Sequence, residues 1–149
     1  MRRSIFATGL VICFGFLASA AFSAASAATH KLALQITDAN PMSMNMVLNV
    51  AGNVTRHYEE KGETVEIKVV AFGPGVMMLR TDKSAVKERL ADFMATHKNV
   101  EFDACNNTLQ AMAKNEGKMP TLLPGVMVVP SGAVALLELG EQGWTILKP

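Results

Sequence analysis

The sequence predicts an α/β protein with a five-stranded, mostly parallel sheet and helices on both of its faces. Five short segments along the chain have the pattern of strands: their residues either alternate between apolar and polar or are continuously apolar. Between them lie stretches whose apolar residues are spaced three and four apart, which is the helical period. The connections are long enough to cross over a sheet, and strands joined by such crossovers run parallel.

The first strand–helix–strand unit has the clearest signals. Residues 31–37 alternate between apolar and polar, which predicts a strand. Asn40 is the predicted N-cap of the next helix and Pro41 its first residue, because both suit those positions. This helix is expected to end near Gly62, where glycine can adopt the left-handed cap. The second strand, residues 64–72, becomes fully apolar at its end, as in a sheet that is covered on both faces.

The segment after the second strand predicts a break and then two helical stretches. Glycine and proline at positions 73–75 end the strand. Residues 76–79 are expected to form a short helical turn that covers the sheet. The next helix is expected to begin at Asp82 or Ser84, which are both suitable caps, and to run to residues 97–99.

The remaining elements complete the alternation of strands and helices. They are a strand at 100–104, a short helix at 109–113, a loop at 115–124, a strand at 125–129, a helix whose apolar face spans 134–139, and a strand at 144–147. In parallel sheets, reactive groups gather beyond the carboxyl ends of the strands. Cys105 directly follows the third strand, so its thiol is expected on that edge, facing an accessible pocket.

Residues 1–28 have the pattern of a secretory signal peptide. Arg2 and Arg3 form a charged start, residues 5–21 are an apolar run, and residues 23–28 are all small. A signal peptidase cleaves after such small residues. The alternative is a retained membrane anchor, because the apolar run is close to the length that spans a bilayer.

Cleavage after Ala27 or Ala28 would leave one domain, residues 29–149, which we expect to be periplasmic and without membrane contact. It would also remove Cys13, so that Cys105 becomes the only thiol of the domain. The periplasm is oxidising, yet a single cysteine cannot form a disulfide within its own chain. Cys105 is therefore buried and inert, paired with another molecule, or chemically reactive.

Four short segments resemble, in order and spacing, those of a known family. They are Gln35-Ile36-Thr37-Asp38, Val70-Ala71-Phe72-Gly73-Pro74-Gly75, Ala104-Cys105-Asn106-Asn107-Thr108-Leu109 and Leu123-Pro124-Gly125-Val126. Together they resemble the small, single-domain members of the DsrE/DsrF-like family over essentially the whole of residues 29–149. The resemblance implies a three-layer α/β/α sandwich with a five-stranded parallel sheet, and assembly into trimers or hexamers. It also implies that Cys105 corresponds to the cysteine on which relatives carry sulfur as a persulfide.

The candidate site residues lie at the expected strand ends. Cys105 is the candidate persulfide carrier, because a helix N-terminus directly after it would lower the pKa of its thiol. The candidate ligand-binding residues are Asp38, Asn40, Gly73, Gly75, Asn106, Asn107 and Ser131. The simpler role of Asp38 is to close its turn, and that of the two glycines is to permit a tight one. Asp103 alternates with Cys105 along the strand and could modulate the thiol, but is expected to be solvated.

Two functional hypotheses follow. In the first, an exported homo-oligomer binds or relays sulfane sulfur through Cys105 and meets a donor or acceptor protein. In the second, the same fold is a non-catalytic ligand-binding or assembly module in which Cys105 is inert. The sequence has no nucleophile elbow, no paired-carboxylate signature and no dinucleotide fingerprint, so we predict no cofactor and assign no enzyme class.

Other binding functions have little support in the sequence. The formal net charge is +1 and there is no run of Lys or Arg, which argues against nucleic acid. Met42, Met44 and Met46 are closely spaced, and thioethers bind Cu(I). On a helix, however, the first and third share a face while Met44 points elsewhere, so we predict no metal site. The three histidines, His30, His57 and His97, also lack metal-ligand spacing.

Overall fold

The computed structural model describes residues 30–149, and the predicted signal peptide lies outside them. Within this range five strands form one sheet in the order β4-β3-β2-β1-β5, and every neighbouring pair is parallel. The strands are β1 (His30–Ile36), β2 (Val65–Ala71), β3 (Val100–Cys105), β4 (Met127–Val129) and β5 (Thr145–Leu147). The predicted α/β fold is confirmed, and the sheet is wholly parallel.

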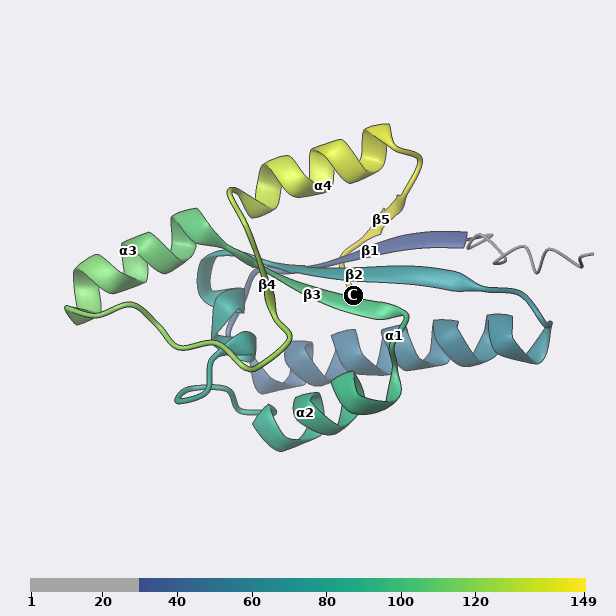
Figure 1. Cartoon of the computed structure of the whole chain (residues 1–149), viewed down its shortest axis with the longest axis horizontal. Helices are drawn as coiled ribbons and strands as arrows, with labels where there is room; N and C mark the ends of the chain where they lie inside the picture. Colours follow the sequence, from purple (N-terminus) through teal and green to yellow (C-terminus); the bar gives the residue numbers. More distant parts are fainter. Residues whose placement is uncertain (1–29) are drawn as a thin grey trace, which may run out of the picture.

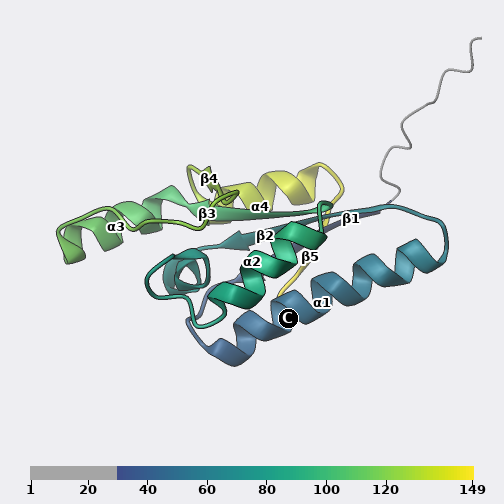
Figure 2. The same ribbon diagram turned by 60° about the horizontal axis from the view of Figure 1, so that its bottom comes forward.

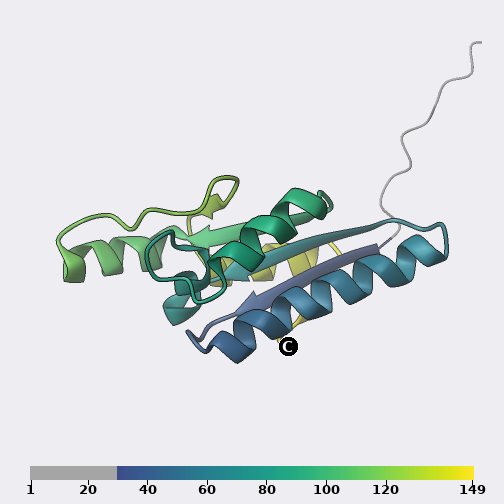
Figure 3. The same ribbon diagram turned by 90° about the horizontal axis from the view of Figure 1, so that it is seen from below.

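Helices cover the two faces of the sheet unequally. Helices α1 (Pro41–Glu60) and α2 (Lys87–Thr96) lie on one face, together with the 3-10 helix η1 (Gly73–Leu79) (Figures 1 and 3). Helix α4 (Gly132–Glu141) lies on the other face. Helix α3 (Asn106–Glu116) extends outward beyond the carboxyl ends of the strands (Figures 1 and 2). This arrangement confirms the predicted three-layer sandwich.

Alternation along β3 assigns its side chains to the two faces. Phe102 and Ala104 belong to the larger core, which packs against α1, α2 and η1. Asp103 and Cys105 therefore point to the side of α4. The smaller core on that side consists of Ala33, Val70, Leu136, Leu139 and Trp144. The only thiol among the described residues thus lies on the thinly covered face of the sheet.

Helix α1 begins as its sequence predicts. The side chain of Asn40 caps it by accepting a hydrogen bond from the backbone N–H of Met42 at 2.9 Å, and Pro41 is its first residue. One stripe of the helix is buried against the sheet and consists of Met44, Val47, Leu48, Ala51 and Thr55. Among residues 30–149, no helix is both long enough and apolar enough to span a membrane.

Three boundaries differ from those expected. Helix α3 begins directly at Asn106 and runs to Glu116, so part of the predicted loop is helical. Helix α2 begins at Lys87 without a side-chain cap, because Asp82 pairs with Arg80 instead. Strand β4 is reduced to three residues, since β3 is its one neighbour and only the carboxyl end of that strand pairs with it.

Candidate functional site

Cys105 lies where the sequence places it, but it is more enclosed than expected. It is the last residue of β3 and the N-cap of α3, so it stands at the carboxyl edge of the sheet. Only 5% of the residue is exposed. The expectation that its thiol faces an accessible pocket is therefore wrong. Its reactivity depends on what surrounds the sulfur.

Polar backbone groups lie near the sulfur. The backbone amides of Thr108 and Asn107, in the first turn of α3, favour a negative charge on Sγ of Cys105, although α3 has no side-chain cap hydrogen bond and the N–H of Asn107 donates to the carbonyl of Pro130. The amide of Gly132, the first residue of α4, favours the same charge. Two helix N-termini thus converge on one sulfur atom, and each presents the positive end of its dipole.

Thr108 also contributes its hydroxyl, whose direction is fixed by a second hydrogen bond. The backbone N–H of Gly73, at the start of η1, donates to Oγ1 of Thr108 at 2.9 Å. Because this oxygen already accepts a hydrogen bond, its own hydrogen is free to point at Sγ of Cys105, where it favours the thiolate. The turn after β2 therefore orients a donor toward the thiol at the end of β3.

These contacts set the acidity of the thiol. Burial raises the pKa of Cys105, because the charged form loses water. The hydrogen bonds from Gly132, Thr108 and Asn107 favour the thiolate, and together they outweigh burial, so that the pKa lies below its ordinary value. A lowered thiol pKa is the property that makes a cysteine nucleophilic near neutral pH.

Two glycines allow the backbone to close around this edge. A Cβ atom on Gly132 would lie 2.9 Å from the ring of Phe72, so any larger residue would move α4 away from Cys105. A Cβ atom on Gly75 would lie 2.3 Å from the carbonyl oxygen of Ile36, at the end of β1. Both positions need a residue without a side chain because of close contact.

The other predicted ligand-binding residues have local structural roles. Asp38 Oδ1 accepts a hydrogen bond from the backbone N–H of Asn40 at 3.0 Å, which closes the turn before α1. Ser131 Oγ caps α4 by accepting from the N–H of Val134. The backbone N–H of Asn107 also contacts the carbonyl of Pro130, which ties α3 to the turn before α4.

The remaining candidates divide between the site and its scaffold. Asn106 opens α3 beside the thiol, and its side chain is half-buried. Asp38 lies two residues beyond β1, which is two strands from β3 and therefore roughly 10 Å from it at the usual strand spacing. The structure thus brings together Cys105, Gly73 and Asn107 from the predicted set, and adds Gly132 and the hydroxyl of Thr108.

Asp103 is not the solvated residue that the sequence suggests. It is 2% exposed, and its Oδ1 has no hydrogen-bond partner within the described residues. Burial and the neighbouring carboxylate of Glu101 raise the pKa of Asp103 to about 6, against the opposing charge of Lys68. Lys68 could neutralise Asp103, but it forms an ion pair with the neighbouring Glu101 at 2.5 Å instead.

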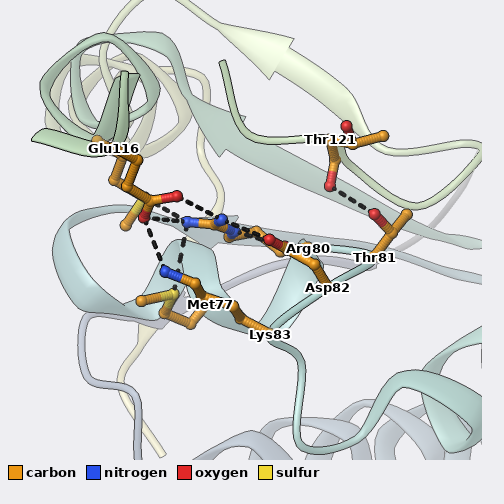
Figure 4. A network of polar contacts seen from close by, with 8 residues as sticks. Met77, Arg80, Thr81, Asp82, Lys83, Glu116 and Thr121 are labelled. Atoms are coloured by element: carbon orange, nitrogen blue, oxygen red, sulfur yellow. Dashed lines mark hydrogen bonds and ion pairs between the residues drawn. The ribbon is translucent and has the colours of Figure 1, made fainter. Parts of the chain in front are cut away.

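Arg80 is a second buried charge, and its role was not predicted from the sequence. Its guanidinium is fully buried and lies between the carboxylates of Asp82 and Glu116, with two hydrogen bonds to each of 2.7 to 2.9 Å (Figure 4). Lys83 adds an ion pair to Glu116 at 3.0 Å. The hydrogen bonds from Arg80 and then Lys83 lower the pKa of Glu116 to about 2. The sequence signal for this buried charge is a single arginine that directly follows the apolar residues 76–79.

The three closely spaced methionines of α1 are divided between the core and the surface. Met44 is buried in the core, whereas Met42 and Met46 are 74% and 45% exposed. His97 stacks on Phe93 at the end of α2. Among residues 30–149, no group of three or more His, Cys, Asp or Glu side chains could hold a metal ion.

Comparisons with known proteins agree with this architecture. The sequence matches the model of the DsrE/DsrF-like family over residues 14–149. The fold is similar to a solved structure described as the protein of unknown function MTH1491 from Methanobacterium thermoautotrophicum, with a TM-score of 0.68. That match has 29% sequence identity and covers 80% of this chain and 99% of the other. No curated protein matches.

Proposed function

This chain belongs to the DsrE/DsrF-like family, and on that premise we propose that it binds and relays sulfane sulfur as a persulfide on Cys105. The observation that carries the proposal is the convergence of two helix N-termini and the Thr108 hydroxyl on Sγ. These donors favour a negative charge on the sulfur, whether it is a thiolate or the inner atom of a persulfide anion.

The proposed step begins with the Cys105 thiolate and a small donor R–S–SH, either a hydropolysulfide or a low-molecular-weight persulfide. Sγ attacks the outer sulfur of the donor, a new S–S bond forms, and the bond between that sulfur and R–S breaks. The electron pair of the broken bond leaves on R–S⁻, which takes a proton from water. Cys105 now carries the S–SH group, and discharge to an acceptor thiolate repeats the same exchange.

The test is sulfur loading of the purified protein. After incubation with polysulfide, mass spectrometry is expected to find one added sulfur atom on Cys105, which a reductant removes. Cys105→Ser is expected to fold normally and to gain none. Native protein that takes up no sulfur over a range of donors would refute the proposal.

The burial of Cys105 favours one alternative, a binding or assembly module in which the thiol is inert. A thiol-labelling reagent separates the two. Modification of the native protein within minutes supports the sulfur relay, whereas modification only after denaturation supports the inert module. In the second case the structural role of Cys105 is that of a small apolar residue, as is common for free cysteine.

We also propose that the protein is a homo-oligomer, a trimer or hexamer, and that it meets a sulfur-donor or acceptor protein. Support comes from the outer edge of the sheet, where Met127 and Val128 of β4 are 55% and 52% exposed. Val134 and Leu137 of α4 are 48% and 63% exposed. Apolar side chains on an unpaired edge strand invite association. Light scattering of the native protein and of Met127→Lys tests this, and a native monomer would refute it.

Export to the periplasm completes the proposal and depends on the sequence of residues 1–28 alone. Arg2 and Arg3, the apolar run and the small residues before position 29 support a cleaved signal peptide. The mature N-terminus, measured by mass spectrometry on fractionated cells, is expected to follow Ala27 or Ala28. Full-length protein in the cytoplasm would refute this part without affecting the proposed chemistry.

A further inference from the structure

Helix α3 supplies the Thr108 amide and hydroxyl that favour the Cys105 thiolate, yet it has little apolar anchorage of its own. Leu109 is its only buried residue, and Met112 is partly buried against the core. The helix projects beyond the carboxyl ends of the strands (Figure 1), so only its first turns lie next to the sheet. Polar contacts at its two ends must therefore contribute to its position.

Those polar contacts both come from the two ends of η1. At the first turn of α3, the N–H of Gly73 donates to Thr108 Oγ1 at 2.9 Å. At the last residue of α3, Glu116 receives two hydrogen bonds from Arg80, which directly follows η1. The start of η1 thus meets the start of α3, and the end of η1 meets its end.

The contact between Arg80 and Glu116, at the last residue of α3, has a well-defined geometry. Arg80 is fully buried and its guanidinium is held by two carboxylates in fork geometry, of which Asp82 lies on the η1 side and Glu116 on α3 (Figure 4). Paired, parallel hydrogen bonds of this kind fix orientation as well as distance. Arg80 also pairs through its backbone with Leu122, which anchors it to the chain that returns from α3.

We propose that Arg80 is a positioning residue for Cys105: by holding Glu116, it fixes the tilt of α3 and keeps the amide and hydroxyl of Thr108 directed at the sulfur. The inference deepens the proposed function, since it concerns the same thiol. Its readout is the acidity of that thiol, which is measurable whether or not the protein carries sulfur.

The experiment measures the rate of Cys105 alkylation against pH in native protein. Glu116→Gln keeps the shape of the side chain and weakens its hold on the guanidinium. Arg80→Lys keeps the charge and loses the fork. Both are expected to raise the thiol pKa by about one unit, so that the alkylation rate below that pKa, taken relative to each variant's own plateau at high pH, falls about tenfold. If Arg80→Lys does not fold, Glu116→Gln decides alone.

The direction of the shift separates positioning from direct charge effects. Removing the negative charge of Glu116 would by itself lower the thiol pKa, so the expected rise has the opposite sign. Asp82→Asn touches the same guanidinium from the η1 side, and Asn99→Ala removes two hydrogen bonds to Thr55 and Val65 far from the thiol. Both are expected to change the rate by less than about threefold.

An unchanged or lowered thiol pKa in folded Glu116→Gln would overturn the proposal. A slowing in either control as large as that in Glu116→Gln would overturn it as well. Failure of the wild-type protein to accept sulfur would refute the proposed function and leave this result unaffected.

Discussion

Arg80 and Asp103 are both charged side chains that the fold buries almost completely, at 0% and 2% exposure, but their surroundings differ sharply. Arg80 meets two carboxylates, and each of its hydrogen bonds favours the charged form. Asp103 meets another carboxylate, and its Oδ1 has no partner. A buried charge is costly unless it is paired, so an unpaired buried acid loses its proton only at a higher pH than usual.

The difference follows from what each neighbouring element provides. Arg80 lies between η1 and the end of α3, where Asp82 and Glu116 reach it from opposite sides. Asp103 lies in the middle of β3, between Val70 and Met127 in the adjoining strands. Cys105 is a third case, since backbone amides rather than a charged side chain favour its anion. The same physical rule thus gives a charged anchor at Arg80, a weakened acid at Asp103 and an acidic thiol at Cys105.

The largest expected effect is the removal of the paired charge. Arg80→Ala leaves Asp82 and Glu116 without their partner and a cavity between η1 and α3. We expect a loss of about 3 to 5 kcal/mol in the free energy of unfolding. Chemical denaturation measures it, with the exposed Arg56→Ala as the control, for which we expect a change within about 0.5 kcal/mol. Equal losses in the two variants would end the contrast between buried and exposed arginine.

Asp103→Asn is expected to have the opposite sign. An amide cannot ionise, so the variant removes the cost of a buried, unpaired carboxylate at neutral pH. We expect the free energy of unfolding at pH 7.5 to increase by about 1 to 2 kcal/mol. Glu101→Gln, on the same face, is the comparison, since it breaks the pair with Lys68. A destabilised Asp103→Asn at this pH would show that the charged form of Asp103 has a partner after all.

The pH dependence of stability sharpens the contrast. The pKa of Asp103 is raised from 3.8 to about 6, so its contribution is complete below its ordinary pKa and is lost as pH rises through 6. The pKa of Glu116 is lowered from 4.5 to about 2, so its contribution is present above 4.5 and is lost as pH falls toward 2. Denaturation at a series of pH values should therefore show highest stability near about pH 4 to 5, from these two groups.

Asp103→Asn is the control for that series. It should flatten the decline between pH 5 and 7 and leave the acid limb unchanged, because the acid limb belongs to Glu116 and Asp82. A decline above pH 5 that persists in the variant would assign it to another group.

The smallest expected effect concerns the thiol. Thr108→Val removes the hydroxyl that donates to Sγ and keeps the shape of the side chain. We expect the thiol pKa to rise by about one unit, with about tenfold slower alkylation below that pKa. Thr96→Val, whose hydroxyl contacts only the end of α2, should leave the rate unchanged. An unchanged rate in Thr108→Val would mean that the backbone amides alone set the acidity.

Much of the fold could be predicted because its signals are local. Alternation in β1 and β2, and the cap formed by Asn40 and Pro41, depend on neighbouring residues only. The position of Cys105 at the edge followed from strand direction. What could not be predicted depends on residues far apart in the sequence. Arg80 and Glu116 are 36 positions apart, and no periodicity links them.

The surroundings of the thiol show the same limit. Gly132 lies near the Cys105 thiol because α4 crosses over β3. The sequence of β3 does not indicate which helix covers that strand. For the same reason Asp103 was expected to be solvated, since a polar residue in an alternating strand usually marks the exposed face. Burial of that face depends on a helix that begins almost thirty residues later.

The enclosure of Cys105 between α3 and α4 has a kinetic consequence. At 5% exposure, we expect a reagent to reach Sγ through a transient opening of the two helix ends, so that the observed rate is the intrinsic rate multiplied by the population of the open form. At high reagent concentration the rate of opening limits the rate of modification, and adding more reagent does not increase it. The outer sulfur of a bound persulfide would be sheltered by the same gate, and its lifetime in water would then be governed by helix motion rather than by sulfur chemistry.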